Sequence, residues 1–374
     1  MHAMRRFIGL MSGTSADAID AVLIECEGSA FKRVAARAAL SYPDSLRSAL
    51  LALGRSQSAV SLEALAELDS AVAEQFAAAA LKLLESTGLP ASAIIAVGSH
   101  GQTVFHRGGD RPATLQIGDG SRIAARCGIT VVSDFRRRDI ALGGQGAPLV
   151  PAFHHAVFAT GDEPRAVLNL GGIANFTLLP DQDPGHVRGF DTGPAGALLD
   201  EWCQRCLGQA YDAQGAWAAS GTVNLQRLKA LLAEPYFAAA PPKSTGRGDF
   251  NLDWLQRLVP DFTELPAADI QATLAELTAA TVAAALLEYQ PQTRRLLICG
   301  GGAGNRDLLG RIRARLPDSI SIESTAAFGL DPQSVEGAAF AWLAMRTLDA
   351  LPGNLPSVTG AVAASPLGAI HPAG

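Results

Sequence analysis

The chain has few of the features that mark a disulfide-bonded, nucleic-acid-binding or membrane protein. Five cysteines, an odd number in 374 residues, do not form a disulfide framework. The 30 basic residues are outnumbered by 36 acidic ones, so no basic excess neutralises a nucleic acid or an anionic membrane surface. No apolar run reaches the ~18 residues of a membrane span, and the run Phe7 to Met11 is too short for a signal peptide. We therefore expect a cytoplasmic protein that binds neither nucleic acid nor membranes.

Several familiar catalytic motifs are also missing. Lys243-Ser244-Thr245 lacks the upstream glycines of a Walker phosphate loop, and no Gly-x-Ser-x-Gly nucleophile elbow occurs. Cys203 and Cys206 have a spacing found in zinc sites, but no second Cys or His pair completes such a site. Because both continue an apolar stripe at helical spacing, we interpret them as part of a helix core.

What the chain does have is length and apolar content. Single hydrophobic cores stop growing beyond ~250 residues, and this chain has 374. Hydrophobic residues make up 48% of it against 18% charged residues, which is typical of a compact enzyme. We predict an N-terminal lobe of residues 1–140 plus 352–374 and a C-terminal lobe of residues 141–351.

Two stretches of the chain repeat one order of elements. The first is predicted to contain strands 6–11, 18–26, 31–40, 94–98 and 129–132, and helices 45–54, 62–84 and 121–127. The second is predicted to contain strands 165–170, 173–179, 187–190 and 295–299, and helices 195–207, 270–289, 305–316 and 334–351. Residues 136–151 are predicted as a loop. Each stretch opens with a glycine-bearing hairpin, so we expect two duplicated α/β lobes facing a central cleft.

Three glycine-bearing turns are candidates for nucleotide binding. The first consists of Gly13, Thr14, Ser15, Ala16, Asp17, Ala18, Ile19 and Asp20. Its glycine lets the backbone bend towards a ligand, its hydroxyls add donors, and Asp17 and Asp20 are candidate Mg²⁺ ligands through water. The other two turns are Gly171-Gly172 and Gly300-Gly301-Gly302. Each alone has the composition of an ordinary turn, and the third lacks the Rossmann spacing because Asn305 replaces a glycine.

Three charged residues are candidates for substrate chemistry. Asp191 follows a predicted strand just before a predicted helix, whose dipole would favour the ionised carboxylate of a general base. Arg136 begins a basic run suited to a substrate carboxylate, and Glu336 is suited to sugar hydroxyls. Each has a structural alternative: a helix cap for Asp191, a solvated charge for Arg136 and a first-turn helix acid for Glu336.

Taken together and in order, these segments resemble the anhydro-N-acetylmuramic acid kinase family, in the superfamily that contains sugar kinases, acetate kinase, Hsp70 and actin. The resemblance spans nearly the whole chain and rests on residues 9–15, 99–103, 115–118, 134–139, 143–151, 168–175, 189–194, 242–247 and 300–302. It implies two ribonuclease H-like (actin-like ATPase) lobes, ATP and Mg²⁺, an amino-sugar substrate from peptidoglycan recycling and a homodimer.

The resemblance also implies a double reaction. Asp191 takes a proton from water, which opens the ring of 1,6-anhydro-N-acetylmuramic acid, and the freed O6 accepts the γ-phosphoryl group of ATP. Ala18 departs from the family pattern, which usually has glycine there, and a methyl group would restrict φ and crowd a phosphate. Two alternatives stay open: a kinase of another sugar or of a carboxylate, and a nucleotide-regulated binding protein of the Hsp70 or actin kind. A sugar-facing base disfavours the last.

Overall fold

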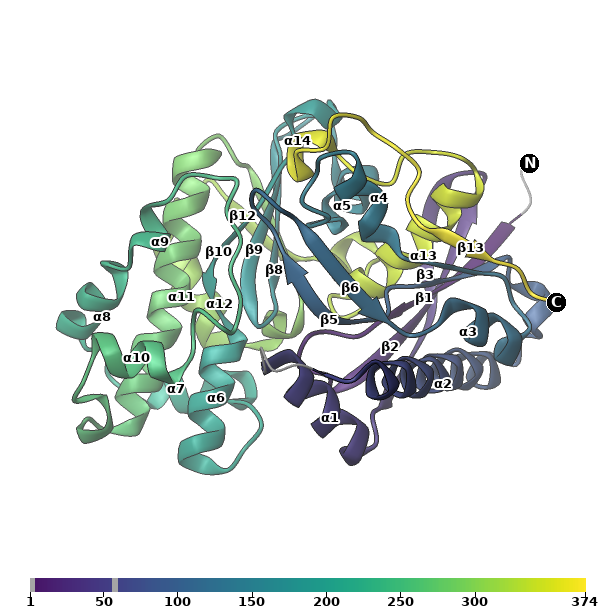
Figure 1. Cartoon of the computed structure of the whole chain (residues 1–374). Coiled ribbons are helices and arrows are strands. Elements are labelled where there is room, and N and C mark those ends of the chain that lie inside the picture. The colour runs from purple at the N-terminus through teal and green to yellow at the C-terminus, as the bar shows by residue number, and fades with distance from the viewer. Residues whose placement is uncertain (1–3, 56–59) are drawn as a thin grey trace. The chain divides into compact units, whose positions relative to one another are not determined.

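The computed structural model describes residues 4–55 and 60–374, and the chain divides into two compact units (Figure 1). The first unit comprises residues 1–157 and 334–374, and the second comprises residues 158–333. These limits differ from the boundaries predicted after residues 140 and 351. The largest difference is helix α13 (Val335–Leu348), which belongs to the first unit because it packs against strands of that unit's sheet.

A six-stranded sheet forms the centre of the first unit, in the order β13-β7-β4-β1-β2-β3. β1, β2 and β3 are antiparallel neighbours, whereas β4 and β7 run parallel to β1. The strands of this unit are β1 (Met4–Met11), β2 (Ala18–Glu27), β3 (Ala30–Ser41), β4 (Ala96–Ser99), β5 (Gln102–Arg107), β6 (Ala113–Ile117), β7 (Val131–Ser133) and β13 (Ala369–His371). Its other helices are α1 (Asp44–Arg55), α2 (Leu62–Thr87), α3 (Gly120–Cys127), α4 (Phe135–Ala141), α5 (Val150–Phe158) and α14 (Pro356–Thr359).

The second unit repeats this strand order in a sheet arranged β10-β9-β8-β11-β12. Here too the first three strands are antiparallel, and the last two run parallel to the first. The strands are β8 (Arg165–Leu170), β9 (Ile173–Leu179), β10 (Arg188–Pro194), β11 (Arg295–Cys299) and β12 (Ser321–Ser324). The α-helices are α6 (Gly196–Leu207), α7 (Ala216–Ser220), α8 (Leu225–Leu232), α9 (Pro235–Ala238), α10 (Leu252–Leu258), α11 (Ala267–Tyr289) and α12 (Arg306–Arg315). The predicted duplication of an α/β lobe is confirmed.

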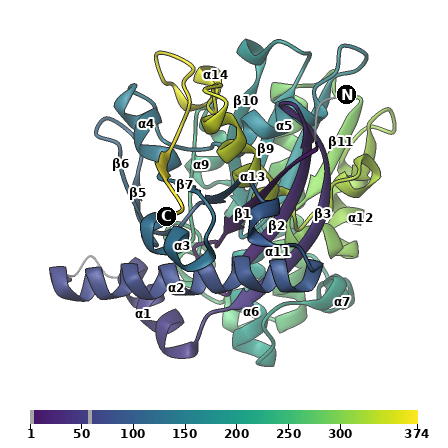
Figure 2. The same cartoon turned by 90° about the vertical axis from the view of Figure 1, so that its right-hand side faces the viewer.

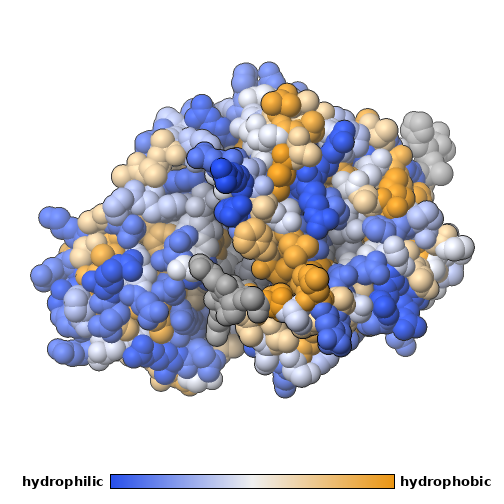
Figure 3. Space-filling model, in the orientation of Figure 1, coloured by the Kyte–Doolittle hydropathy of each residue, from blue (hydrophilic) through white to orange (hydrophobic). Residues whose placement is uncertain are grey.

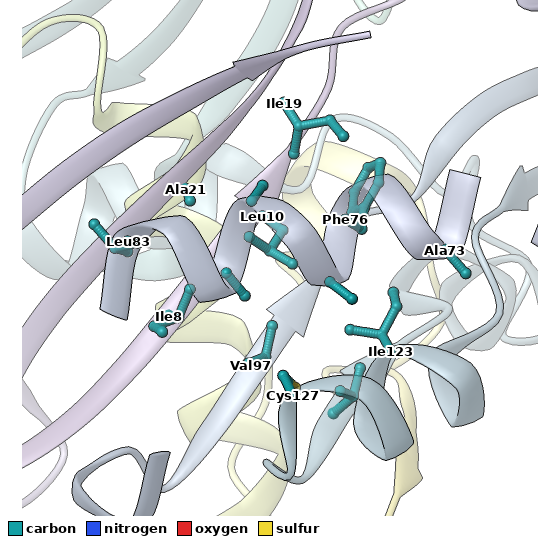
Figure 4. Packing of buried hydrophobic residues seen from close by; sticks show 14 of the residues in the cluster. Ile8, Leu10, Ile19, Ala21, Ala73, Phe76, Leu83, Val97, Ile123 and Cys127 are labelled. Atoms are coloured by element: carbon teal, nitrogen blue, oxygen red, sulfur yellow. The ribbon is translucent and has the colours of Figure 1, made fainter. Parts of the chain in front are cut away.

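Different helices cover the two faces of the first sheet. Ile8 and Leu10 of β1 point into a cluster with Phe76 of α2 (Figure 4), and α3 lies alongside α2 (Figure 2). Because successive side chains of a strand alternate between faces, Gly9 points to the opposite face, where α13 lies. A methyl group on Gly9 would lie 1.8 Å from the carbonyl oxygen of Gly337. Backbone contact at this glycine therefore fixes the first turn of α13 beside β1.

The second unit has two hydrophobic cores, and α11 contributes to both of them. One core lies on the sheet and the other among the helices, where Trp202, Trp254 and Phe262 meet. By length and composition alone α11 qualifies as a membrane span, contrary to the expectation that the chain has no such segment. However, 83% of its most apolar window is buried inside the protein, as in a core helix. Cys203 is buried in α6, as its spacing predicts, but Cys206 is exposed, so its assignment to the helix core is wrong.

Several segments depart from the predicted pattern. The predicted loop 136–151 contains α4 and the start of α5, because Asp134, with a φ of 56°, turns the chain directly from β7 into α4. The hairpin of β5 and β6, strands β12 and β13, and helices α7 to α10 and α14 are absent from the prediction because each of them is short. The strand predicted to end at Phe190 continues to Pro194, with an irregularity between Asp191 and Gly193.

Candidate active site

The hairpin between β1 and β2 has a turn in an unusual backbone conformation. The N–H of Ala16 donates to the carbonyl of Gly13 (3.1 Å), and Ala16 has a φ of 48°. The left-handed region costs a residue with a side chain about 1 kcal/mol. Ala16 is 1% exposed, so packing holds the turn in this form. Turns with left-handed residues often direct successive N–H groups towards an anion, which suits the predicted phosphate contact.

Buried side chains from other elements hold the base of this hairpin. The Ser12 hydroxyl donates to Gln102 Oε1 (2.8 Å), and the Tyr42 hydroxyl donates to the same oxygen (3.2 Å). Gln102 Nε2 donates in turn to the carbonyl of Gly13 (3.1 Å). Sequence reasoning includes Gln102 only as part of segment 99–103 and misses Tyr42, which follows β3.

The other residues of the predicted phosphate stretch divide by exposure. Gly13 and Thr14 are exposed and Ser15 is half-buried, whereas the Ile19 side chain is fully buried in the core. Ala18 lies in β2 opposite Ser41 and outside the left-handed region. The expectation that alanine restricts the backbone there is therefore wrong, because an extended strand accommodates any side chain.

Asp17 and Asp20 differ as candidate metal ligands. Asp17 is exposed and forms an ion pair with Arg47 (2.5 Å). Asp20 is half-buried in β2, and burial raises the pKa of its carboxyl group. Within residues 4–55 and 60–374, no group of three or more His, Cys, Asp or Glu side chains is arranged to hold a metal. Mg²⁺ usually keeps several waters and binds one or two carboxylates together with substrate phosphates, and these two residues fit that mode.

Arg136 and Glu336, predicted separately as sugar contacts, lie close together in the first unit. The negative charge of Glu336 opposes the effect of burial, which lowers the pKa of Arg136 to about 10. Arg136 donates to His100 Nε2 (Nη2 2.8 Å) and to the carbonyl of Gly146 (2.8 Å). Arg137, next along the chain, is exposed. Of the basic run, Arg136 thus lies within electrostatic range of Glu336, which is in the first turn of α13.

His100 connects this pair to a cavity of about 450 Å³ in the first unit. Burial and the charge of Arg136 hold the pKa of His100 well below its usual value, so the ring is neutral at pH 7. The cavity lies at the carboxyl ends of β4 and β7, where His100 and Asp134 face the apolar side chains of Leu65 and Leu115. Figure 3 shows hydrophobic atoms gathered on this unit near the β5–β6 hairpin and α2. Sequence reasoning does not find this cavity, since its lining comes from distant turns.

In the second unit, Asp191 takes part in three hydrogen bonds with residues 236–245. Thr245 N–H donates to its Oδ2 (2.9 Å), and its own N–H donates to the carbonyl of Lys243 (3.1 Å). The hydroxyl of Tyr236 donates to its carbonyl (2.9 Å). Residues 236–245 therefore fix both the backbone and the side chain of the candidate base. Sequence reasoning includes 242–245 in the family resemblance but assigns none of these residues to the site.

The environment of Asp191 differs from the one predicted. Burial raises the pKa of its carboxyl group to about 6, and the N–H of Thr245 opposes the shift in part. The expected effect of a helix dipole is wrong because β10 continues to Pro194 and α6 begins at Gly196. The alternative of a helix cap is also wrong, since the N-cap position of α6 is Ala195.

The two glycine turns of the second unit are built differently. The carbonyls of Gly171 and Gly172 accept hydrogen bonds from the N–H groups of residues 195–197. At the third turn, a methyl group on Gly300 would lie 2.3 Å from Asn169 Oδ1, and one on Gly302 would lie 2.7 Å from Leu170 Cβ. These two glycines are needed for packing against β8, whereas a methyl group on Gly301 would meet nothing within 4 Å.

Comparison with known proteins identifies the family. The model of the anhydro-N-acetylmuramic acid kinase family matches residues 5–373. The chain belongs to this kinase family. Anhydro-N-acetylmuramic acid kinase from Xanthomonas axonopodis pv. citri is 55% identical over 98% of this chain and 98% of its own. The kinase of that name from Photobacterium profundum is 47% identical over 99% of this chain and 100% of its own.

Solved structures similar to this kinase are more distant. An activator of 2-hydroxyisocaproyl-CoA dehydratase from Clostridium difficile has a TM-score of 0.46 and 14% identity, over 92% of this chain and 96% of that chain. A ROK hexokinase from Thermus thermophilus has a TM-score of 0.36 and 16% identity, over 91% of this chain and 99% of that chain. The duplicated fold of this family member follows from its own strand order.

Proposed function

We propose that this chain is an ATP-dependent kinase that opens the 1,6-anhydro ring of 1,6-anhydro-N-acetylmuramic acid and phosphorylates the freed O6. The products are N-acetylmuramic acid 6-phosphate and ADP, and the reaction belongs to peptidoglycan recycling. The observation that carries the proposal is Asp191, a half-buried carboxyl group that is held by hydrogen bonds and whose pKa is raised to about 6, in a member of this kinase family. A general base works best when its pKa lies near the operating pH.

In this reaction Asp191 acts on water. Its carboxylate takes a proton as the water oxygen bonds to the anomeric carbon and the bond between that carbon and O6 breaks. The electron pair left on O6 attacks the γ-phosphorus of ATP, and ADP leaves. Because the phosphoryl group traps the departing alkoxide, the reaction needs no second carboxylic acid of the kind that most glycosidases use as proton donor.

The nucleotide is assigned to residues 13–20, 171–172 and 300–302. The left-handed turn at Ala16 and the exposed Thr14 support the first assignment, and the open position of Gly301 supports the third. Mg²⁺, when bound, neutralises charge on the phosphate oxygens. Asp17 and Asp20 are the residues that would hold it, through water.

The acceptor sugar is assigned to Arg136 and Glu336. With a pKa of about 10, Arg136 is charged at neutral pH and suits the carboxylate of the lactyl group, which a guanidinium binds through paired hydrogen bonds. Glu336 suits sugar hydroxyls. The cavity beside His100 is lined by Arg137 and by neither Arg136 nor Glu336, so the assignment rests on the charges and positions of those two residues.

The test is ADP release with Mg²⁺-ATP and a panel of acceptors: the anhydro sugar, N-acetylglucosamine, glucose and acetate. We expect turnover with the anhydro sugar and a loss of roughly 10³-fold or more in Asp191→Asn. Asp253→Asn, at an exposed aspartate of α10, is the matched control and should keep wild-type turnover. Full activity in Asp191→Asn would remove the base assignment, and turnover with glucose or acetate alone would favour another kinase of this superfamily.

The proposal extends to assembly and location. We infer a homodimer in the cytoplasm, as the family resemblance implies. Light scattering from the purified chain measures the first, and a monomeric mass at micromolar concentration would contradict it. Cell fractionation measures the second, and recovery with the membrane or periplasmic fraction would contradict it.

A further inference from the structure

We propose that Arg247 contacts the phosphoryl group that is transferred. The inference rests on the proposed kinase function. Arg247 ends segment 242–247, which contributes to the family resemblance, but the sequence alone assigns it no role. Its basis is the position of one arginine between two parts of the second unit: the glycine hairpin of β8 and β9, and the loop that clamps Asp191.

The guanidinium of Arg247 lies against the Gly171-Gly172 turn. A methyl group on Gly172 would lie 3.5 Å from Arg247 Nε and 3.6 Å from Nη2, which is van der Waals contact, so the guanidinium lies directly beside this turn. Two residues earlier, Thr245 donates its N–H to Asp191. One short segment therefore positions the candidate base and brings a cation to the hairpin assigned to phosphate.

A hydrogen bond holds the backbone of Arg247, whereas its side chain is unpaired among the described residues. Asn251 Nδ2 donates to the carbonyls of Arg247 (3.3 Å) and Gly248 (3.0 Å), and Asp249 accepts from the Thr245 hydroxyl (2.8 Å). The guanidinium itself is exposed and has no hydrogen bond or ion pair with any residue that the structure describes. A guanidinium presents its donors in a planar fork that matches phosphate oxygens.

Other positive groups near this hairpin are already engaged. The N–H groups of residues 195–197, at the start of α6, donate to the carbonyls of Gly171 and Gly172. Lys243, the other cation of the loop, donates to the carbonyls of Tyr236 and Phe237 (3.1 and 3.2 Å). Arg247 is therefore the cation best placed to neutralise charge that develops on a phosphoryl group here.

The test compares Arg247→Ala and Arg247→Lys with Arg257→Ala, a matched control at an exposed arginine of α10. We expect Arg247→Ala to lower kcat by about 10²-fold, the usual effect of losing one donor to a transition state, with KM for the sugar nearly unchanged. Lysine should restore part of kcat because it keeps the charge without the fork, and added guanidinium chloride at millimolar concentration should partly rescue Arg247→Ala. A kcat within threefold of wild type, or an equal loss in Arg257→Ala, would overturn the proposal.

A second measurement separates this proposal from the kinase proposal. Calorimetry of the full chain with a non-hydrolysable ATP analogue and with inorganic phosphate needs no acceptor and no turnover. Weaker binding in Arg247→Ala than in Arg257→Ala supports the phosphate contact even if no acceptor is turned over, which would count against the kinase proposal alone. Equal binding in the two variants would overturn the role of Arg247.

Discussion

At Asp191, the requirements of catalysis and of stability oppose each other. The carboxyl group is half-buried in β10, where, among the residues that the structure describes, the N–H of Thr245 is the one donor to its oxygens. Burial without a cationic partner keeps a proton bound to a higher pH than in water. The same environment supplies a base whose pKa suits neutral conditions and makes the ionised form costly to the fold.

The first prediction concerns the pH dependence of turnover. Because protonated Asp191 accepts no proton, kcat/KM should fall about tenfold per pH unit below about pH 6 and level off above it. Initial rates between pH 4.5 and 8 with the anhydro sugar measure this profile. An acidic limb centred near pH 4 would mean that the carboxyl group is solvated in the working enzyme.

The second prediction concerns stability. The pKa of Asp191 is raised from 3.8 to about 6 by folding, so between these pH values the folded state retains a proton that the unfolded chain releases. The free energy of unfolding therefore decreases as pH rises through this window, by up to about 3 kcal/mol for two pKa units. Asp191→Asn should be more stable than wild type at pH 7 by up to this amount, and the difference should vanish near pH 4.

Urea unfolding of both proteins at pH 4 and pH 7 measures this effect. Asp253→Asn, at an exposed position, is the control and should show little difference at either pH. If Asp191→Asn were no more stable than wild type at pH 7, burial would not be the cause of the raised pKa.

At the scale of elements, glycines decide how closely α13 approaches the first sheet. The helix meets β1 at Gly9 and β4 at Gly98, where a methyl group would lie 2.0 Å from the carbonyl oxygen of Phe340. This contact places Glu336, in the first turn of α13, near Arg136, which follows β7. The packing of one helix thus brings together two residues that are 200 positions apart in sequence.

The third prediction tests this packing. Gly98→Ala should destabilise the protein by at least the 1–3 kcal/mol typical of overpacked cores, because neither the sheet nor the helix backbone yields easily. Gly310→Ala, in α12, is the opposite control. A methyl group there meets nothing within 4 Å, and alanine should stabilise the helix by about 0.5–1 kcal/mol. Thermal unfolding of both variants measures the two signs, and a neutral Gly98→Ala would contradict the close contact.

At the scale of the whole molecule, the two units have the same strand order but different continuity. The second is one segment, residues 158–333, with its own cores. The first is assembled from residues 1–157 and 334–374, because α13 covers one face of its sheet and β13 adds a strand beside β7. The two units therefore have the same strand order, but one is built from two segments of the chain and the other from a single segment.

The fourth prediction follows from this difference. Residues 158–333 expressed alone should fold cooperatively, whereas residues 1–157 alone should not, since the face of β1 and β4 that α13 covers would be exposed to water. Circular dichroism and hydrogen exchange of the two fragments measure this. Adding a peptide of residues 334–374 to the fragment of residues 1–157 should restore protection from hydrogen exchange in β1 and β4. Such protection without the peptide would contradict the prediction.

Much of the fold and part of the site could be predicted from local pattern. The hairpin before Ala18, the buried strand before Gly300 and the apolar stripe around Cys203 are short-range signals, and the structure confirms those elements. The end of β10 could not be predicted, because a local irregularity rather than composition carries the strand past Asp191. The clamp from Thr245 and the placement of Arg247 depend on contacts across 54 and more residues, which no local pattern encodes.

The sequence by itself determined the duplicated order of strands and helices, the glycine turns and the family, because periodicity and turn chemistry act over a few residues. The tertiary structure alone decided that Ala18 is unstrained, that Arg136 lies within electrostatic range of Glu336 and that α13 belongs to the first unit. It also decided the pKa of the candidate base, Asp191. The pKa of Asp191 depends on burial by residues distant in sequence, and desolvation is a property of the folded protein.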